Sequence, residues 1–125
     1  MPDEIPLHRR HEATEQRVAE LSRTLGDEHA ETLAAMLDLA DITYTQGRLI
    51  ATRKLEEAVV AARRRLFGDG HGETLKAMRK LGVTLAAQGD LAAARELQDR
   101  VVTGMRALWG DEDRETLRAL NNFAG

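Results

Sequence analysis

Apolar residues recur every three or four positions along this chain, which is the spacing of one face of a helix and not of a strand. After His29 the apolar positions are Leu33, Met36, Leu37, Ala40 and Tyr44. A second run from about Leu49 to Leu66 has Leu49, Leu55, Val59 and Leu66 on one side. Gly47, between the runs, fits the position just after a helix end, where glycine adopts a left-handed backbone at little cost. The pattern predicts two helices joined by a short turn.

This helix pair repeats along the chain at a fixed interval. A short motif, an apolar residue followed by Gly-Asp, recurs every 42 residues: Leu25-Gly26-Asp27, Phe67-Gly68-Asp69 and Trp109-Gly110-Asp111. Residues 25–66 laid over residues 67–108 are identical at 19 of 42 positions without a gap. Repeats of this length indicate stacked supersecondary units. We therefore expect one domain over 1–125, made of a half repeat (9–24), two full repeats (25–66 and 67–108) and the first helix of a third (109–125).

The connections between these helices are short, so neighbouring helices should run antiparallel. In the second copy Asp90 should cap the helix that begins at Leu91. One hairpin cannot bury both of its apolar faces, and stacked hairpins solve this by sharing a continuous core. The sequence thus predicts an all-α fold, an α-solenoid of antiparallel helix hairpins with about five to six helices.

The repeat resembles the 42-residue tetratricopeptide repeat of kinesin light chains. The likeness rests on Leu25-Gly26-Asp27-Glu28-His29-Ala30-Glu31-Thr32-Leu33, followed by Leu39-Ala40 and Gln46-Gly47. It implies a right-handed solenoid and a non-catalytic protein–protein interaction scaffold, which presents a concave groove lined by the first helix of each hairpin. The chain departs from the family where an asparagine often holds the backbone of a bound peptide. That slot contains Asp38, Lys80 and Asn122.

The resemblance places the exposed residues of the first helices on the concave face. One end of this groove should be acidic with a tyrosine, and the other end basic. Its residues are Leu37, Asp38, Asp41, Tyr44, Thr45, Lys76, Arg79, Lys80, Val83, Arg118, Asn121 and Asn122. We expect the cations at 76, 79, 80 and 118 to receive acidic side chains or the C-terminal carboxylate of an extended peptide. A plain solvated surface is the alternative.

The last predicted helix has no partner helix to cover it. Leu117, Leu120 and Phe123 would lie on its open side. We therefore expect a second copy to cover this uncapped end, which gives a homodimer or a higher oligomer. Two further functions stay open: a purely structural self-association module, and an interaction segment cut from a larger signalling ATPase or regulator.

Composition excludes several classes of protein. The chain has 18 basic and 21 acidic residues and a net charge of −3, which argues against a binder of nucleic acid or of anionic membranes. Cysteine is absent, so disulfides, thiolate catalysis and cysteine zinc sites are excluded. No apolar run approaches the roughly 20 residues that span a bilayer, and the first residues lack the apolar core of a secretory signal. These features predict a cytoplasmic protein.

Candidate chemistry is sparse, and we expect no enzymatic activity, metal or cofactor. His8 and His11 stand three residues apart but have no third ligand nearby. His29 and His71 follow the repeat, which indicates a capping or packing role. The segment 68–72 lacks the Lys-Ser/Thr of a phosphate loop. The run Arg63-Arg64-Arg65 is expected to be a solvated helix end, with phosphate binding as the alternative.

Overall fold

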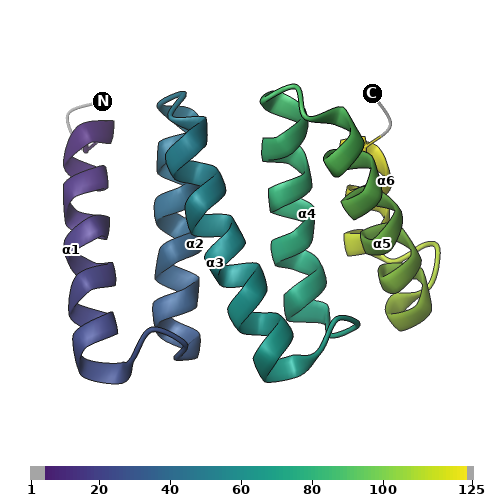
Figure 1. Cartoon of the computed structure of the whole chain (residues 1–125), viewed down its shortest axis with the longest axis horizontal. Coiled ribbons are helices and arrows are strands. Elements are labelled where there is room, and N and C mark those ends of the chain that lie inside the picture. Colours follow the sequence, from purple (N-terminus) through teal and green to yellow (C-terminus); the bar gives the residue numbers. More distant parts are fainter. Residues whose placement is uncertain (1–4, 124–125) are drawn as a thin grey trace. The chain divides into compact units, whose positions relative to one another are not determined.

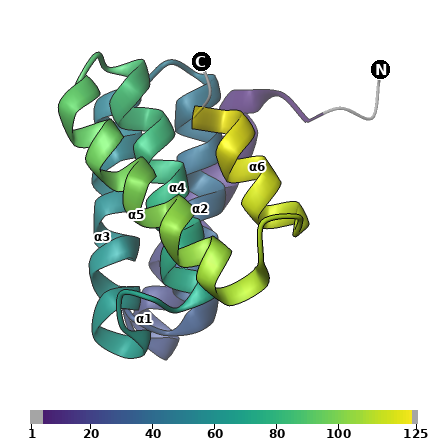
Figure 2. The ribbon, with the colours of Figure 1, turned by 90° about the vertical axis from the view of Figure 1, so that its right-hand side faces the viewer.

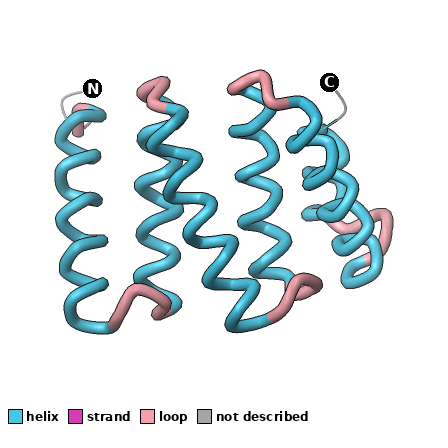
Figure 3. The backbone as a smooth tube through the Cα atoms, viewed as in Figure 1, coloured by secondary structure: helices cyan, strands magenta, loops and turns pink. Residues whose placement is uncertain are grey.

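A computed structural model describes residues 5–123 of the chain, and the side chains of residues 5–121. Six helices follow one another in this part, and it contains no strand (Figures 1 and 3). They are α1 (Leu7–Leu25), α2 (Ala30–Thr45), α3 (Leu49–Phe67), α4 (Gly72–Ala87), α5 (Leu91–Trp109) and α6 (Arg114–Phe123). The prediction of an all-α fold with about five to six helices is confirmed.

The helix starts keep the period of the sequence. α2, α4 and α6 begin 42 residues apart, and so do α1, α3 and α5. Each chain segment between helices is a short loop (Figure 3). The half repeat expected from residue 9 begins two residues earlier, at Leu7, directly after Pro6. Proline favours an extended residue before it and a helix after it, which explains this start.

The first helix of each hairpin is capped at the same repeat position. The Nδ1 atom of His29 accepts a hydrogen bond from the Glu31 N–H at 3.1 Å, and His71 accepts one from Glu73 at the same distance. In the third copy this position is Asp113, whose Oδ1 accepts from the Glu115 N–H at 2.8 Å. These bonds satisfy backbone donors that a helix start leaves open. The predicted capping role of the two histidines is confirmed.

Two other predicted turn features are present. Gly47 and Gly89 have φ angles of 78° and 86°, in the left-handed region that closes a helix. The Asp90 carboxylate accepts a hydrogen bond from the Ala93 N–H at 3.4 Å, at the start of α5. Local sequence signals therefore place the ends of these helices correctly.

Contacts divide the chain into two compact units, residues 1–55 and residues 56–125, with the boundary inside α3. In the first unit α1 packs antiparallel beside α2 (Figure 1). The core side of α2 holds Leu33, Leu37 and Ala40, whereas α1 has no fully buried residue. A buried hydrogen bond of 2.7 Å joins the hydroxyls of Thr43 and Thr52, and so ties the end of α2 to the start of α3.

In the second unit α4 packs on α5, and α6 contacts both of them (Figure 2). Leu75, Met78, Val101 and Met105 are fully buried there. Gly104 permits the close approach of α5, because a Cβ atom at this position would lie 2.7 Å from Cδ1 of Leu75.

One expectation about the basic run is wrong. Arg63 is not a solvated helix end: it is 8% exposed. Its guanidinium donates a 3.0 Å hydrogen bond to the backbone oxygen of Glu73 and lies 3.6 Å from the Glu73 carboxylate. Burial lowers the pKa of Arg63, and the Glu73 charge partly opposes that shift. The arginine thus joins the end of α3 to the start of α4 within the second unit.

Candidate interaction surfaces

The exposed face of α2 is acidic. Asp38, Asp41, Tyr44 and Thr45 all have exposed side chains, as the resemblance implied. Asp38 and Asp41 are three residues apart, which puts their carboxylates on one side of the helix. The Thr45 hydroxyl donates to the backbone oxygen of Asp41 at 3.0 Å. This face can therefore present two negative charges beside an aromatic ring.

Leu37 does not belong to this exposed face. Its side chain is 9% exposed, so its expected place on an open groove is wrong. Leu33, Leu37 and Ala40 follow one another at spacings of four and three, which puts them on the same side of α2. Leu33 and Ala40 are in the core, and Leu37 is buried with them.

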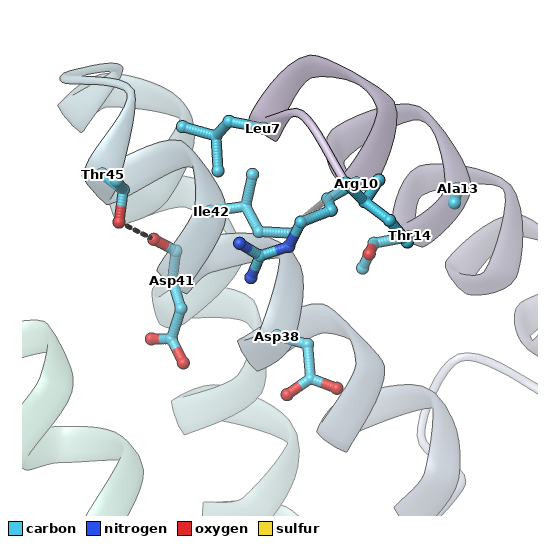
Figure 4. Close-up of a pocket in the computed structure, with 9 residues that line it drawn as sticks. Leu7, Arg10, Ala13, Thr14, Asp38, Asp41, Ile42 and Thr45 are labelled. Atoms are coloured by element: carbon cyan, nitrogen blue, oxygen red, sulfur yellow. Dashed lines mark hydrogen bonds between the residues drawn. The ribbon is translucent and has the colours of Figure 1, made fainter. Parts of the chain in front are cut away.

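A pocket of about 430 Å³ lies between the first half of α1 and the last two turns of α2. Figure 4 shows Leu7 and Ile42 pointing toward each other, while Arg10 reaches from α1 toward α2. The pocket is lined by Ile5, Leu7, Arg10, Ala13, Thr14, Asp38, Asp41, Ile42 and Thr45. We call it the α1–α2 pocket. It combines an aliphatic wall with two carboxylates.

Sequence reasoning missed the contribution of α1 to this site. Arg10 occupies the repeat position of Thr52 and Ala94, which are both fully buried. The repeat alignment already shows this difference: Arg10 is long and charged, whereas the equivalent residues of the other copies are small and buried. The alignment alone does not show that Arg10 lies next to Asp38 and Asp41.

The basic residues expected on the first helices fall in the second unit. Lys76, Arg79, Lys80 and Val83 are half-buried on α4, and Arg118 and Asn121 are exposed on α6. These two helices are in contact. The side chain of Asn122 lies outside the described residues. The α4–α6 surface, by which we mean these six described residues, is therefore cationic.

Lys76 and Arg118 each lie close to a side chain of the second unit. The Lys76 ammonium lies 5.7 Å from the centre of the Trp109 ring, within the range of a cation–π interaction. The ring can come this close because residue 72 is glycine: a Cβ there would lie 2.8 Å from the Trp109 ring. The Arg118 guanidinium lies 3.8 Å from the Glu115 carboxylate. These neighbours restrict where the two cations can point.

The apolar residues expected on α6 are only partly exposed. Leu117 is 51% exposed, Leu120 is half-buried, and the side chain of Phe123 lies outside the described residues. Thr116 and Ala119 are fully buried, and they share a helix face with Leu120, whereas Leu117 points away from that face.

The described residues contain no group of three or more His, Cys, Asp or Glu that could hold a metal ion. Within the same residues, no helix is both long and apolar enough to cross a membrane.

Comparison with known proteins points to one family. A family model described as a tetratricopeptide repeat matches residues 46–107. No curated protein sequence matches the chain. A crystal structure of nearly identical TPR-like repeats of a putative kinesin light chain from Podosopora anserina is similar, with a TM-score of 0.87 and 27% identity. A crystal structure of a variant of the same protein is similar with a TM-score of 0.88 and the same identity. Each match covers 94% of this chain, and this chain spans 56% of the matched one.

Proposed function

The chain is a tetratricopeptide-repeat protein of the kinesin-light-chain-like class, and on that premise we propose that it is a non-catalytic scaffold for protein interaction. Repeats of this family generally serve as protein-interaction scaffolds. The exposed faces of the first helices α2, α4 and α6 would bind a peptide or a protein partner. Of these faces, the α4–α6 surface supports the most specific form of the proposal.

This proposal rests on one observation, the partial burial of the cations on one face of α4. Lys76, Arg79 and Lys80 are half-buried and share one helix face. Half-buried side chains have already lost part of their rotamer freedom, so an anion binding to them pays less conformational entropy. Arg118 adds a fourth cation from α6, which contacts α4. This set favours acidic side chains or a C-terminal carboxylate of an extended peptide.

Selection from a random peptide library displayed on phage tests the proposal. The whole chain is immobilised, and we expect enrichment of sequences with Asp, Glu or a free C-terminal carboxylate. The Arg79→Glu/Lys80→Glu double variant should lose these peptides. The Lys54→Glu/Arg95→Glu variant is a matched control, because it makes the same charge change at exposed positions of α3 and α5.

A circular dichroism spectrum and a thermal melt of each variant show whether the fold is intact. Absence of any enriched sequence would contradict the scaffold proposal. Enrichment that the charge reversal at 79 and 80 leaves unchanged would contradict the role of the α4–α6 surface.

Self-association is the second candidate, and the exposure of Leu117 supports it. A leucine that is half exposed on an amphipathic helix can pack against a second copy. Light scattering on a size-exclusion column should then give a mass that rises with concentration, and Leu117→Ser should lower it. A monomer mass at all concentrations would exclude this candidate.

A further inference from the structure

The loop between α3 and α4 contains the only Asp-Gly pair in the sequence, Asp69-Gly70. The equivalent pairs of the other two copies are Asp27-Glu28 and Asp111-Glu112. Glycine has no side chain to shield its amide nitrogen from the carboxyl group of the preceding residue. The second copy therefore has a backbone position whose chemistry differs from that of the other two copies.

Both residues of this pair are open to water. Asp69 is fully exposed and Gly70 is exposed. The Gly70 N–H donates no hydrogen bond within the part of the chain that the structure describes. The pair borders a hollow of about 450 Å³, which also has Thr103 and Gly104 of α5 on its wall. The Asp69 carboxyl group thus has room to turn toward the Gly70 nitrogen without displacing another side chain.

We propose that Asp69-Gly70 is a site of spontaneous backbone modification, at which the peptide bond converts to an isoaspartyl linkage. The Gly70 nitrogen forms a bond to Cγ of Asp69, while its proton and the hydroxyl of the protonated carboxyl group leave as one water. The product is a cyclic imide, to which one water then adds. If the bond to Cγ breaks, aspartate is restored. If the bond to the backbone carbonyl carbon breaks, the chain continues through the side chain of Asp69.

Arg64 restrains this reaction. Its Nε donates a 2.7 Å hydrogen bond to Oδ1 of Asp69. This bond, and then the charge of Arg64, lower the pKa of the Asp69 carboxyl. Ring closure uses the neutral carboxyl group, because an ionised oxygen is a poor leaving group. Arg64 therefore keeps the reactive fraction of Asp69 small and slows the modification.

The modification would loosen the start of α4. An isoaspartyl linkage adds one methylene to the backbone two residues before His71, whose Nδ1 accepts the hydrogen bond that caps α4. It also replaces the side-chain carboxylate that Arg64 holds with one on the backbone. We expect the modified chain, once separated by chromatography, to melt about 4 °C lower, which is the shift that loss of one helix cap gives in a chain of this size.

Peptide mapping of the whole chain after weeks at physiological temperature and mildly acidic pH tests the proposal. Trypsin cuts each copy into a distinct peptide: residues 24–48, 66–76 and 107–114. We expect peptide 66–76 to appear as two species of equal mass and different retention. A methyltransferase that recognises isoaspartyl carboxyl groups should label only the new species, with S-adenosylmethionine as the donor. The other two peptides, which contain the Asp-Glu pairs, should stay unlabelled.

Two variants separate the roles of Gly70 and Arg64. Gly70→Glu introduces the residue of the other copies into open space, because a Cβ atom there meets nothing within 4 Å, and it should abolish the labelling. Arg64→Ala should speed the conversion several-fold. Arg106→Ala is its matched control, since Arg106 pairs with Asp111 in the third copy at 3.0 Å, and it should leave the rate unchanged. Circular dichroism shows whether each variant keeps its fold.

Three outcomes would overturn the inference. The first is a folded chain that stays unmodified under conditions that convert the synthetic peptide 66–76. The second is equal labelling of the three tryptic peptides, and the third is a Gly70→Glu variant that converts as fast as the original chain. A rate that Arg64→Ala leaves unchanged would overturn the protective role of Arg64.

Discussion

The junction between α1 and α2 and the junction between α3 and α4 begin from nearly the same residues but are held by different bonds. Both have the Gly-Asp pair, the capping histidine and the following Glu-Thr-Leu. At the first junction the Thr32 hydroxyl donates to the backbone oxygen of Gly26 at 2.8 Å. At the second junction the equivalent Thr74 hydroxyl is buried with no hydrogen-bond partner among the described residues.

The second junction is held instead by Arg63, which donates to the backbone of Glu73. The equivalent residues of Arg63 in the other copies are Leu21 and Met105. A repeat thus specifies where a helix begins through local bonds, while the bonds that tie one helix to the next differ between copies. The following predictions test that distinction.

The largest effect is expected at Arg63. Arg63→Ala removes a buried side chain and leaves the Glu73 backbone oxygen without this donor, so the free energy of unfolding should fall by about 3 kcal/mol. The Glu73 carboxylate is 47% exposed, so loss of the ion pair itself adds little. Urea denaturation measures the change.

Arg63→Met separates the charge from the packing. Met105 is fully buried at the same position of the next copy, so methionine suits this environment. Replacing a buried charge with an apolar side chain of similar volume is often neutral, and we expect a change below about 1 kcal/mol. If the methionine variant is as unstable as the alanine variant, the bond to Glu73 matters more than the packing.

The second prediction exchanges alanine and glycine between equivalent positions of α3 and α5. Ala62 is buried, and Ala62→Gly should cost about 1.5 kcal/mol through lost methyl burial and greater backbone entropy in the unfolded chain. Gly104→Ala should also destabilise, by about 1 kcal/mol, because the new methyl meets both terminal carbons of the buried Leu75. Helix propensity alone predicts the opposite, a gain in stability for Gly104→Ala.

Thermal melts of both variants decide between these effects. Leu75→Val combined with Gly104→Ala is the matched test, because the shorter side chain makes room for the added methyl. The double variant should be more stable than additivity predicts. A stabilising Gly104→Ala would mean that the two copies do not differ in helix packing here.

These differences separate the features that could be predicted from the sequence from those that could not. The helix starts, the histidine caps and the glycine turns could be predicted because each depends on a few neighbouring residues. The burial of Leu37 and of Arg63 could not, because it depends on which side chains meet across the packed helices. The α1–α2 pocket was missed for the same reason: Arg10 and Asp38 are distant in sequence and belong to different helices.

The third prediction compares the two threonines directly. Thr32→Val removes the hydrogen bond to Gly26 and leaves that backbone oxygen without this donor, so it should cost about 1 kcal/mol. Thr74→Val has the same shape change at a hydroxyl without a partner, and we expect a change of about 0.5 kcal/mol or less. Equal losses in chemical denaturation would show that the two junctions are energetically alike.

The smallest effect is expected at the loop aspartates Asp27 and Asp69, which follow Gly26 and Gly68 at the two junctions. Asp27 accepts a hydrogen bond from Ser22, and Asp69 accepts one from Nε of Arg64 at 2.7 Å. Arg64 lowers the pKa of the Asp69 carboxyl, first through this hydrogen bond and then through its charge. Arg64→Ala should therefore raise the pKa of Asp69 toward its ordinary value, as a carboxyl carbon titration can measure.

The sign of the pH dependence follows from this shift. A carboxyl with a lowered pKa in the folded state stabilises the fold above its unfolded pKa, and this contribution is lost as the pH falls through the folded pKa. Asp69 is fully exposed, so solvent screens the interaction and the effect on unfolding should be the smallest of the series. Arg106→Ala, at the equivalent position of α5, should leave the pKa of Asp69 unchanged. If both variants shift it equally, the cause is the overall charge of the chain and not the bond to Arg64.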